Sequence, residues 1–290
     1  DKERLIEALA VRESRRCLEE LDAAIGEVVW RDDSHAGAVP QFFAASSPII
    51  ADGMAIAQLG GEDGGAIVAC DLASGEERWR WDGEGPQYAS PVLMSVGDTT
   101  QVVTLTAQSL VGVNVADGAL LWQVPFVPQG RAYNAATPII DGDLVFYTGA
   151  GRGANAVRIV AGDDGFAVED VWSNPEVATQ FNTPVLEGGL LFGLFQGGTL
   201  FCLDAQTGAT AWREETQLDR GGFGPMVATT TAIFVLPSSG ELIVFAPTGD
   251  AYAELARYQV SETPTFAHPV LAGNRIFVKG QDTLTLWTLP

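Results

Sequence analysis

This sequence predicts an all-β fold in which one four-stranded sheet recurs along the chain. Three observations lead there: a turn phrase ending in tryptophan recurs four times, a proline marker recurs six times, and 33 glycines can supply turns between short strands. The 290 residues are enough for one large all-β domain or for two ordinary domains. With 47% hydrophobic residues, the chain can also build a sizeable core.

The turn phrase is clearest in LFCLDAQTGATAW, residues 200–212, where a Gly lies four residues after Asp204 and four before Trp212. The same spacing of Asp or Asn, Gly and Trp recurs around Gly26, Gly75 and Gly118. We expect the Gly to adopt the positive φ of a hairpin turn and the Asp to accept hydrogen bonds from turn amides. An indole buries about 150–250 Å², so the Trp is expected to fill the gap between neighbouring sheets.

The proline marker is a Pro followed by two apolar residues, and its copies lie 41 to 47 residues apart, at positions 48, 91, 138, 184, 225 and 269. Apolar runs and turn residues alternate between the markers, which leaves room for four strands of roughly 5–6 residues. Four-stranded sheets at a period of about 40–45 residues predict a β-propeller, in which neighbouring sheets bury each other's faces.

Two units depart from this pattern. In the third, Gly165 lies seven residues before Trp172, which predicts a longer hairpin. In the fifth, Tyr258 is expected to take the place of the Trp.

The two ends of the chain predict how the propeller closes. The sixth unit, residues 268–290, has three apolar runs, whereas EVVWRDD at residues 27–33 is a strand with no unit before it. We therefore predict six blades, the sixth closed by residues 27–33. Residues 1–20 have a helical composition, so we expect a helical segment at 1–24 and a propeller domain at 25–290. The alternative is that RCLEELD, residues 16–22, is a worn third strand of a further blade in a larger propeller.

The composition excludes several function classes. The chain has 16 basic and 37 acidic residues, a net charge of −21, which argues against nucleic acid and anionic membranes as direct partners. No apolar run reaches the length of a membrane helix. Cysteine occurs three times, at positions 17, 70 and 202, without the spacing of zinc, redox or haem sites. We expect Cys70 and Cys202 to be buried in apolar strands.

The turn phrase resembles the pyrroloquinoline-quinone-like propeller repeat. That repeat reads close to CLDA-x-TG-x-x-x-W, and CLDAQTGATAW at residues 202–212 matches it nearly letter for letter. The resemblance covers roughly residues 21–290 and is greatest to secreted bacterial members without an assigned function, which implies a periplasmic or extracellular location. The family also includes quinoprotein dehydrogenases and the periplasmic scaffold lipoprotein of outer-membrane assembly, so the fold alone does not fix the function.

The resemblance to quinoprotein dehydrogenases implies a quinone held between a Trp and a ring of two adjacent cysteines, beside a calcium ion. Here no two cysteines are adjacent, and the tryptophans occupy repeat positions that predict packing. Cys70 and Cys202 fall in different blades, too far apart for a disulfide. We therefore predict no catalytic residue, no metal site and no bound cofactor.

Candidate binding residues lie in the loops that join one blade to the next, which meet at one face of a propeller. Each loop has an aromatic or amide residue shortly before the proline marker, and two carry an Arg. Either these residues cover the edge of the core or they form a recognition surface. The candidates are Phe43, Tyr88, Arg131, Tyr133, Gln180, Phe181, Arg220, Phe223, Phe266 and His268.

These observations favour a non-catalytic binding or scaffold protein that recognises another protein or a small ligand at the loop face. The first alternative is a quinoprotein-like oxidoreductase or a degenerate remnant of one. The second is a structural subunit of a larger complex, docked through the N-terminal helix.

Overall fold

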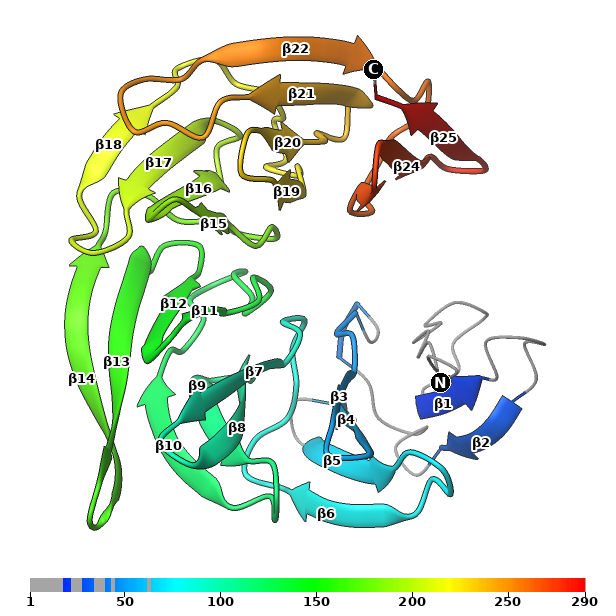
Figure 1. The fold of residues 1–290 in the computed structure, drawn as a ribbon, viewed down its shortest axis with the longest axis vertical. Helices are drawn as coiled ribbons and strands as arrows, with labels where there is room; N and C mark the ends of the chain where they lie inside the picture. The colour runs from blue at the N-terminus through cyan, green and yellow to red at the C-terminus, as the bar shows by residue number, and fades with distance from the viewer. Residues whose placement is uncertain (1–17, 22–27, 34–39, 43–44, 62–63, 290) are drawn as a thin grey trace. The chain divides into compact units, whose positions relative to one another are not determined.

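The computed structural model describes residues 18–21, 28–33, 40–42, 45–61 and 64–289 (Figure 1). Every regular element in these residues is a β-strand, which confirms the predicted all-β fold. The described part of the chain contains no helical segment with the length and apolarity of a membrane span.

The strands form six sheets in chain order, preceded by a separate strand pair. The N-terminal strand pair is β1 (Leu18–Leu21) with β2 (Val28–Asp32). Sheet one is β3 (Ile49–Ala51), β4 (Met54–Leu59), β5 (Ala66–Asp71) and β6 (Glu77–Trp81), and sheet two is β7 (Val92–Val96), β8 (Thr99–Leu105), β9 (Ser109–Asn114) and β10 (Leu120–Pro125). Sheet three is β11 (Ile139–Asp141), β12 (Leu144–Thr148), β13 (Ala154–Gly162) and β14 (Gly165–Asn174).

The remaining strands complete the series. Sheet four is β15 (Val185–Glu187), β16 (Leu190–Leu194), β17 (Leu200–Asp204) and β18 (Thr210–Arg213), and sheet five is β19 (Met226–Ala228), β20 (Ile233–Val235), β21 (Glu241–Phe245) and β22 (Glu254–Gln259). Sheet six is β23 (Val270–Ala272), β24 (Arg275–Lys279) and β25 (Leu284–Thr288). Each proline marker thus precedes the first strand of a sheet, as the repeat predicted.

The chain divides into two compact units, and the division passes through sheet three. The first unit holds residues 1–145 and 157–169, and the second holds residues 146–156 and 170–290. Within each of the six sheets, the strands lie side by side in chain order from the first strand to the last (Figure 1).

The turn phrase has the predicted geometry. Asp204 Oδ1 accepts hydrogen bonds from the backbone N–H groups of Gln206 and Thr207 at 3.0 and 2.8 Å. Asp71 does the same in sheet one. Gly208 has a φ of 70°, a left-handed conformation that disfavours any side chain.

Four tryptophans on outer strands pack on the turn of the following sheet. Their indole N–H groups donate to a backbone carbonyl there, in the pairs Trp30–Leu72 (2.9 Å), Trp79–Val115 (2.7 Å), Trp172–Ala205 (2.9 Å) and Trp212–Thr248 (2.8 Å). Trp122 instead donates to the Gln101 side chain in its own sheet. A Cβ on Gly208 would lie 2.5 Å from the Trp172 ring. The Gly is therefore needed both for its φ and for the close approach of the preceding Trp.

The core consists of apolar layers between successive sheets. Between sheets four and five, Phe192, Cys202 and Trp212 pack against Ile243 and Phe245. Similar layers lie between sheets one and two and between sheets five and six. Small sheets that bury each other's faces in this way are the packing of a β-propeller.

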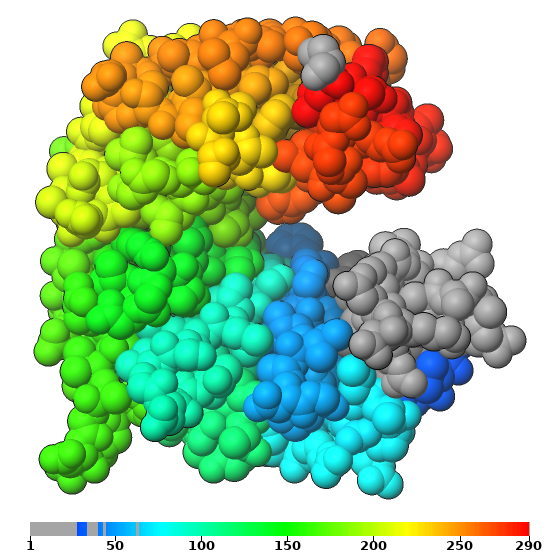
Figure 2. Space-filling view, viewed as in Figure 1, coloured from blue at the N-terminus to red at the C-terminus, as the bar shows by residue number. Residues whose placement is uncertain are grey.

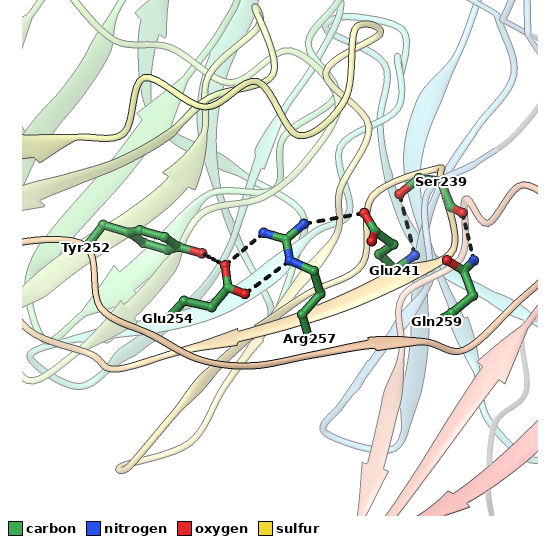
Figure 3. Close-up of polar contacts among 6 residues, drawn as sticks. All are labelled: Ser239, Glu241, Tyr252, Glu254, Arg257 and Gln259. Carbon is green, nitrogen blue, oxygen red and sulfur yellow. Dashed lines mark hydrogen bonds and ion pairs between the residues drawn. The ribbon is translucent and has the colours of Figure 1, made fainter.

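Sheet five corrects one sequence prediction. Tyr258 is 52% exposed and does not replace the Trp; the residue paired with Ile243, where sheet four pairs Cys202 with Trp212, is Arg257. Arg257 donates to Glu254 at 2.8 Å and lies 3.4 Å from Glu241, so a polar network occupies this position (Figure 3). The loop between β21 and β22 is longer than the turn between β17 and β18, which changes the spacing from the turn to the residue that faces the next sheet. A change by an odd number of residues places a given strand residue on the opposite face of the sheet.

The N-terminal prediction also needs correction. β2 has β1 as a hydrogen-bonded neighbour, and sheet six has three strands. The closure of the last blade by residues 27–33 would join the two units, and it stays a prediction. Residues 18–21 are a strand and not part of a helix, as the alternative of a worn third strand predicted. The rest of the predicted helix, residues 1–17 and 22–24, lies outside the described residues. Trp30 nevertheless packs on sheet one as an outer-strand Trp does.

Candidate functional site

The loops that connect successive sheets lie at the same end as the loops between the second and third strands of a sheet. Backbone hydrogen bonds join the two sets, for example from Leu218 N–H to Gly198 O at 2.8 Å and from Gln196 N–H to Ala178 O at 3.0 Å. All the predicted site residues that the structure describes lie in or beside these loops. We call this end of each unit its loop face.

The loop face of the first unit carries one aromatic cluster, made of Phe42, Tyr88 and Tyr133. The ring centroids lie 5.4 to 6.1 Å apart, with Tyr133 edge-on to both other rings. The Tyr88 hydroxyl accepts a hydrogen bond from the Phe42 N–H at 3.1 Å. Phe42 is 58% exposed and both tyrosines are half-buried. The predicted Phe43 lies outside the described residues, and its neighbour Phe42 is the one seen in this cluster.

The loop face of the second unit carries another, made of Phe181, Phe223 and Phe266. Phe181 and Phe223 stack in parallel with centroids 4.6 Å apart, and Phe266 meets Phe223 edge-on at 5.4 Å. Phe266 is 63% exposed. An aromatic ring held this open to solvent is a common anchor for binding.

Polar candidates flank both clusters. Arg131 is exposed two residues before Tyr133, and Arg220 is exposed three residues before Phe223. Gln180 is half-buried beside Phe181. Each cluster is thus an apolar centre with a cation on the same loop, in a chain whose net charge is −21.

Asp219 fixes the loop that carries Arg220 and Phe223. It is buried, and its carboxylate accepts hydrogen bonds from the backbone N–H groups of Gly221 and Phe223 at 2.7 and 3.2 Å and from the Ser238 side chain. Burial raises the pKa of Asp219, but these hydrogen bonds outweigh it, so the pKa lies below its ordinary value. The sequence analysis missed this residue, because a single Asp in a loop gives no sign of its partners.

Two buried asparagines also hold the loops. Asn134 Nδ2 donates to the carbonyls of Thr106 and Phe126 at 2.9 and 3.1 Å. Asn182 Nδ2 donates to Gly222 O, and its Oδ1 accepts from Gly224 N–H at 3.0 Å. Both lie shortly before a proline marker. The amide residue that recurs before these markers is the sequence feature from which their role could have been predicted.

Three of the residues that precede a proline marker link successive sheets of the first unit. Ser47 N–H donates to Ser90 Oγ at 2.9 Å, and Ser90 N–H donates to Thr137 Oγ1 at 3.1 Å. His268 holds the same position in the sixth repeat and is exposed. Desolvation by nearby atoms lowers the pKa of its imidazole, against the opposing effect of a hydrogen bond with the Met226 backbone.

The described residues do not fit a quinone and its metal. Cys70 and Cys202 are buried and free, and burial is the largest cause that raises their thiol pKa values to about 11 and about 12. Trp30, Trp79, Trp172 and Trp212 hold sheets together, as described above. Within the described ranges, His, Cys, Asp and Glu form no group of three that could hold a metal ion.

Comparison with known proteins finds a family model and a related protein that match this chain. The model of a family described as outer membrane protein assembly factor BamB matches residues 7–214. The outer membrane protein assembly factor BamB of Shewanella oneidensis is 24% identical over 325 residues, covering 93% of this chain and 79% of that protein.

Solved structures show the same fold at low sequence identity. BamB from Moraxella catarrhalis has a TM-score of 0.51 and 15% identity, over 91% of this chain and 89% of that one. Quinohemoprotein alcohol dehydrogenase from Comamonas testosteroni has a TM-score of 0.64 and 15% identity, over 91% of this chain and 60% of that one. An outer membrane assembly factor and an alcohol dehydrogenase thus share this architecture. The fold alone does not distinguish a binding protein from an enzyme, so the distinction depends on the residues of the site.

Proposed function

Because the chain belongs to the family of the outer membrane protein assembly factor BamB, we propose that it is a non-catalytic propeller that binds a protein partner during the assembly of outer-membrane proteins. The proposed binding surfaces are the loop faces of the two units, each with its own aromatic cluster, and the proposed location is the bacterial cell envelope. The observation that carries the proposal is the exposure of Phe42 and Phe266, each of which contacts a second aromatic ring of its cluster.

The clusters have the physical properties of a protein-binding surface. Aromatic residues and Arg are enriched at such surfaces because they bury much area and retain a polar or cationic contact. The stacked pair of Phe181 and Phe223 limits the motion of the ring against which Phe266 lies. A partner that covers Phe266 therefore orders few additional side chains on this protein, which lowers the entropic cost of binding.

The oxidoreductase alternative has less support. The likeness to quinohemoprotein alcohol dehydrogenase extends to the fold, at 15% identity. In the described residues, four tryptophans donate hydrogen bonds to a neighbouring sheet, and Cys70 and Cys202 lie in strands of different sheets. Those residues also contain no group of three His, Cys, Asp or Glu that could hold a metal ion.

The test uses the organism that encodes the chain. Its gene is deleted, and outer-membrane β-barrel proteins are quantified by mass spectrometry after complementation with the wild-type gene, with Phe266→Ser, with Phe42→Ser or with the control Leu120→Ser. Leu120 is 41% exposed on β10, away from the aromatic clusters, so the control removes a similar exposed apolar side chain.

We expect the deletion to lower the outer-membrane proteins, the wild type and Leu120→Ser to restore them, and the two Phe variants to restore them poorly at equal protein abundance. Exposed sites change stability by about 0.5 kcal/mol or less, so all three variants should fold. Unchanged outer-membrane protein levels in the deletion strain would refute the role in assembly. Full restoration by both Phe variants would refute the site.

A further inference from the structure

Glu84 joins the loop between sheets one and two to the sheet that follows it. Its half-buried carboxylate accepts hydrogen bonds from four uncharged groups, all of them in sheet two or in the loop between β8 and β9. The donors are the Ser109 hydroxyl at 2.9 Å, the Gln123 side-chain amide at 2.6 Å, the Gln108 backbone N–H at 3.3 Å and the Thr106 hydroxyl. Hydrogen bonds to an ionised acceptor are stronger than neutral ones, so together they hold this loop against sheet two.

Asp219 makes the corresponding contacts in the second unit. Its carboxylate accepts from the Ser238 backbone N–H at 3.2 Å and from the Ser238 hydroxyl. Ser238 lies between β20 and β21, the second and third strands of the following sheet, just as Thr106 and Gln108 lie between β8 and β9. Each unit thus has a carboxylate that ties a connecting loop to the same place on the next sheet; the first unit runs from blue to green in Figure 2 and the second from green to red.

Both carboxylates lie four residues before an aromatic ring of a cluster. Glu84 precedes Tyr88 at this spacing, and Asp219 precedes Phe223. Each of these two rings contacts both other rings of its cluster. The position of the loop therefore sets the position of this ring, and through it the position of the exposed Phe that packs on it.

From these observations we infer that Glu84 and Asp219 are positioning residues for the binding surfaces of the two loop faces. The inference rests on the proposed function, because each carboxylate holds an aromatic cluster in the orientation that a partner meets. A loop that is already ordered loses less conformational entropy when a partner covers it, so binding is tighter than to a loop that moves. Asp71 and Asp204 also accept backbone hydrogen bonds, but they lie in the turns between third and fourth strands.

The first measurement is hydrogen exchange of the purified chain, followed by mass spectrometry. Glu84→Gln should speed exchange in residues 106–109, and Asp219→Asn should speed it in residues 220–224, by about tenfold or more. In each variant an amide group replaces one carboxylate oxygen, so a donor faces the donors of the loop. This measurement reports on the loops whether or not the partner is known.

The second measurement is complementation of the deletion strain, with outer-membrane proteins quantified as for the proposed function. At equal protein abundance, Glu84→Gln, Glu84→Asp and Asp219→Asn should restore these proteins poorly. Glu84→Asp keeps the charge but is one methylene shorter, so it separates a role in positioning from one that needs only a negative charge. Asp71→Asn and Asp204→Asn are the matched controls, because each changes a carboxylate that accepts backbone hydrogen bonds in a turn, and both should restore fully.

Ser109→Ala and Ser238→Ala each remove a single donor and test the same contacts if a carboxylate variant does not fold. Unchanged exchange in the loops, or an equal loss of restoration with the two turn controls, would overturn the inference. Full restoration by the carboxylate variants, while the Phe variants restore poorly, would overturn it and leave the proposed function intact. If the deletion itself leaves outer-membrane protein levels unchanged, the proposed function fails, and hydrogen exchange alone then decides whether the two carboxylates hold the loops.

Discussion

Replacing Trp212 by Ala tests the packing on which the fold depends. The indole is 8% exposed, and its ring centroid lies 6.0, 6.2 and 5.9 Å from those of Phe192, Phe245 and Tyr252. Its N–H also donates to Thr248 O at 2.8 Å. The side chain therefore joins sheets four and five by both apolar contact and a hydrogen bond.

The expected cost follows from these contacts. Removing a buried Trp side chain leaves a cavity and lowers the free energy of unfolding by about 3–5 kcal/mol. Within that total, the Thr248 carbonyl loses its donor, a contribution of about 1 kcal/mol. Trp212→Phe retains part of the ring packing and loses the donor, so we expect a smaller reduction, about 1–3 kcal/mol.

Urea titration followed by far-ultraviolet circular dichroism measures the free energy of unfolding, with the slope on urea compared between variants. Trp287→Ala is the control, because Trp287 is 41% exposed on β25 and should cost about 1 kcal/mol or less. A loss below about 1 kcal/mol for Trp212→Ala, or an equal loss for Trp287→Ala, would show that the repeated Trp does not hold the sheets together.

Two further predictions concern the turns and the loop face. Gly208→Ala should lower the melting temperature more than Gly188→Ala, since both have a positive φ but only at Gly208 would the new Cβ meet Trp172; equal losses would show that backbone strain alone matters. Because the pKa of Asp219 is lowered in the folded protein, its stabilising contribution is present above the ordinary carboxyl pKa and is lost as pH falls through the folded-state value. Asp219→Asn should therefore flatten the decline of melting temperature with acid, and an unchanged acid limb would exclude that role.

The turn phrase was predictable because its interactions are local in sequence. Asp204, Gly208 and the turn amides lie within five residues of one another, so spacing alone specified the capping hydrogen bonds and the positive φ. The positions of the sheets followed as well, because the proline markers occur at a nearly constant period.

Partners that are distant in sequence were not predictable in the same way. Residues 28–32 have the sequence pattern of an outer strand, and such a strand could pair with the third strand of any sheet. The sequence therefore does not identify its neighbour, which the structure shows to be β1. Arg257 and Tyr258 are adjacent, and a change of one residue in the register exchanges which of them faces the next sheet. The role of Asp219 depends on Ser238, 19 residues away, which no spacing rule indicates.

Departures from the repeat therefore carry more information about function than the repeat itself. Where Asp, Gly and Trp occur at the regular spacing, their hydrogen bonds and ring contacts are used within the fold, and little of these side chains remains for a ligand. Phe42 and Phe266 take no part in these repeated turn and indole contacts, and both are exposed. Because the shared pattern already explains stability, an exposed residue that breaks it without improving packing is the better candidate for recognition. By this reasoning Phe266 is the first position at which binding should be measured.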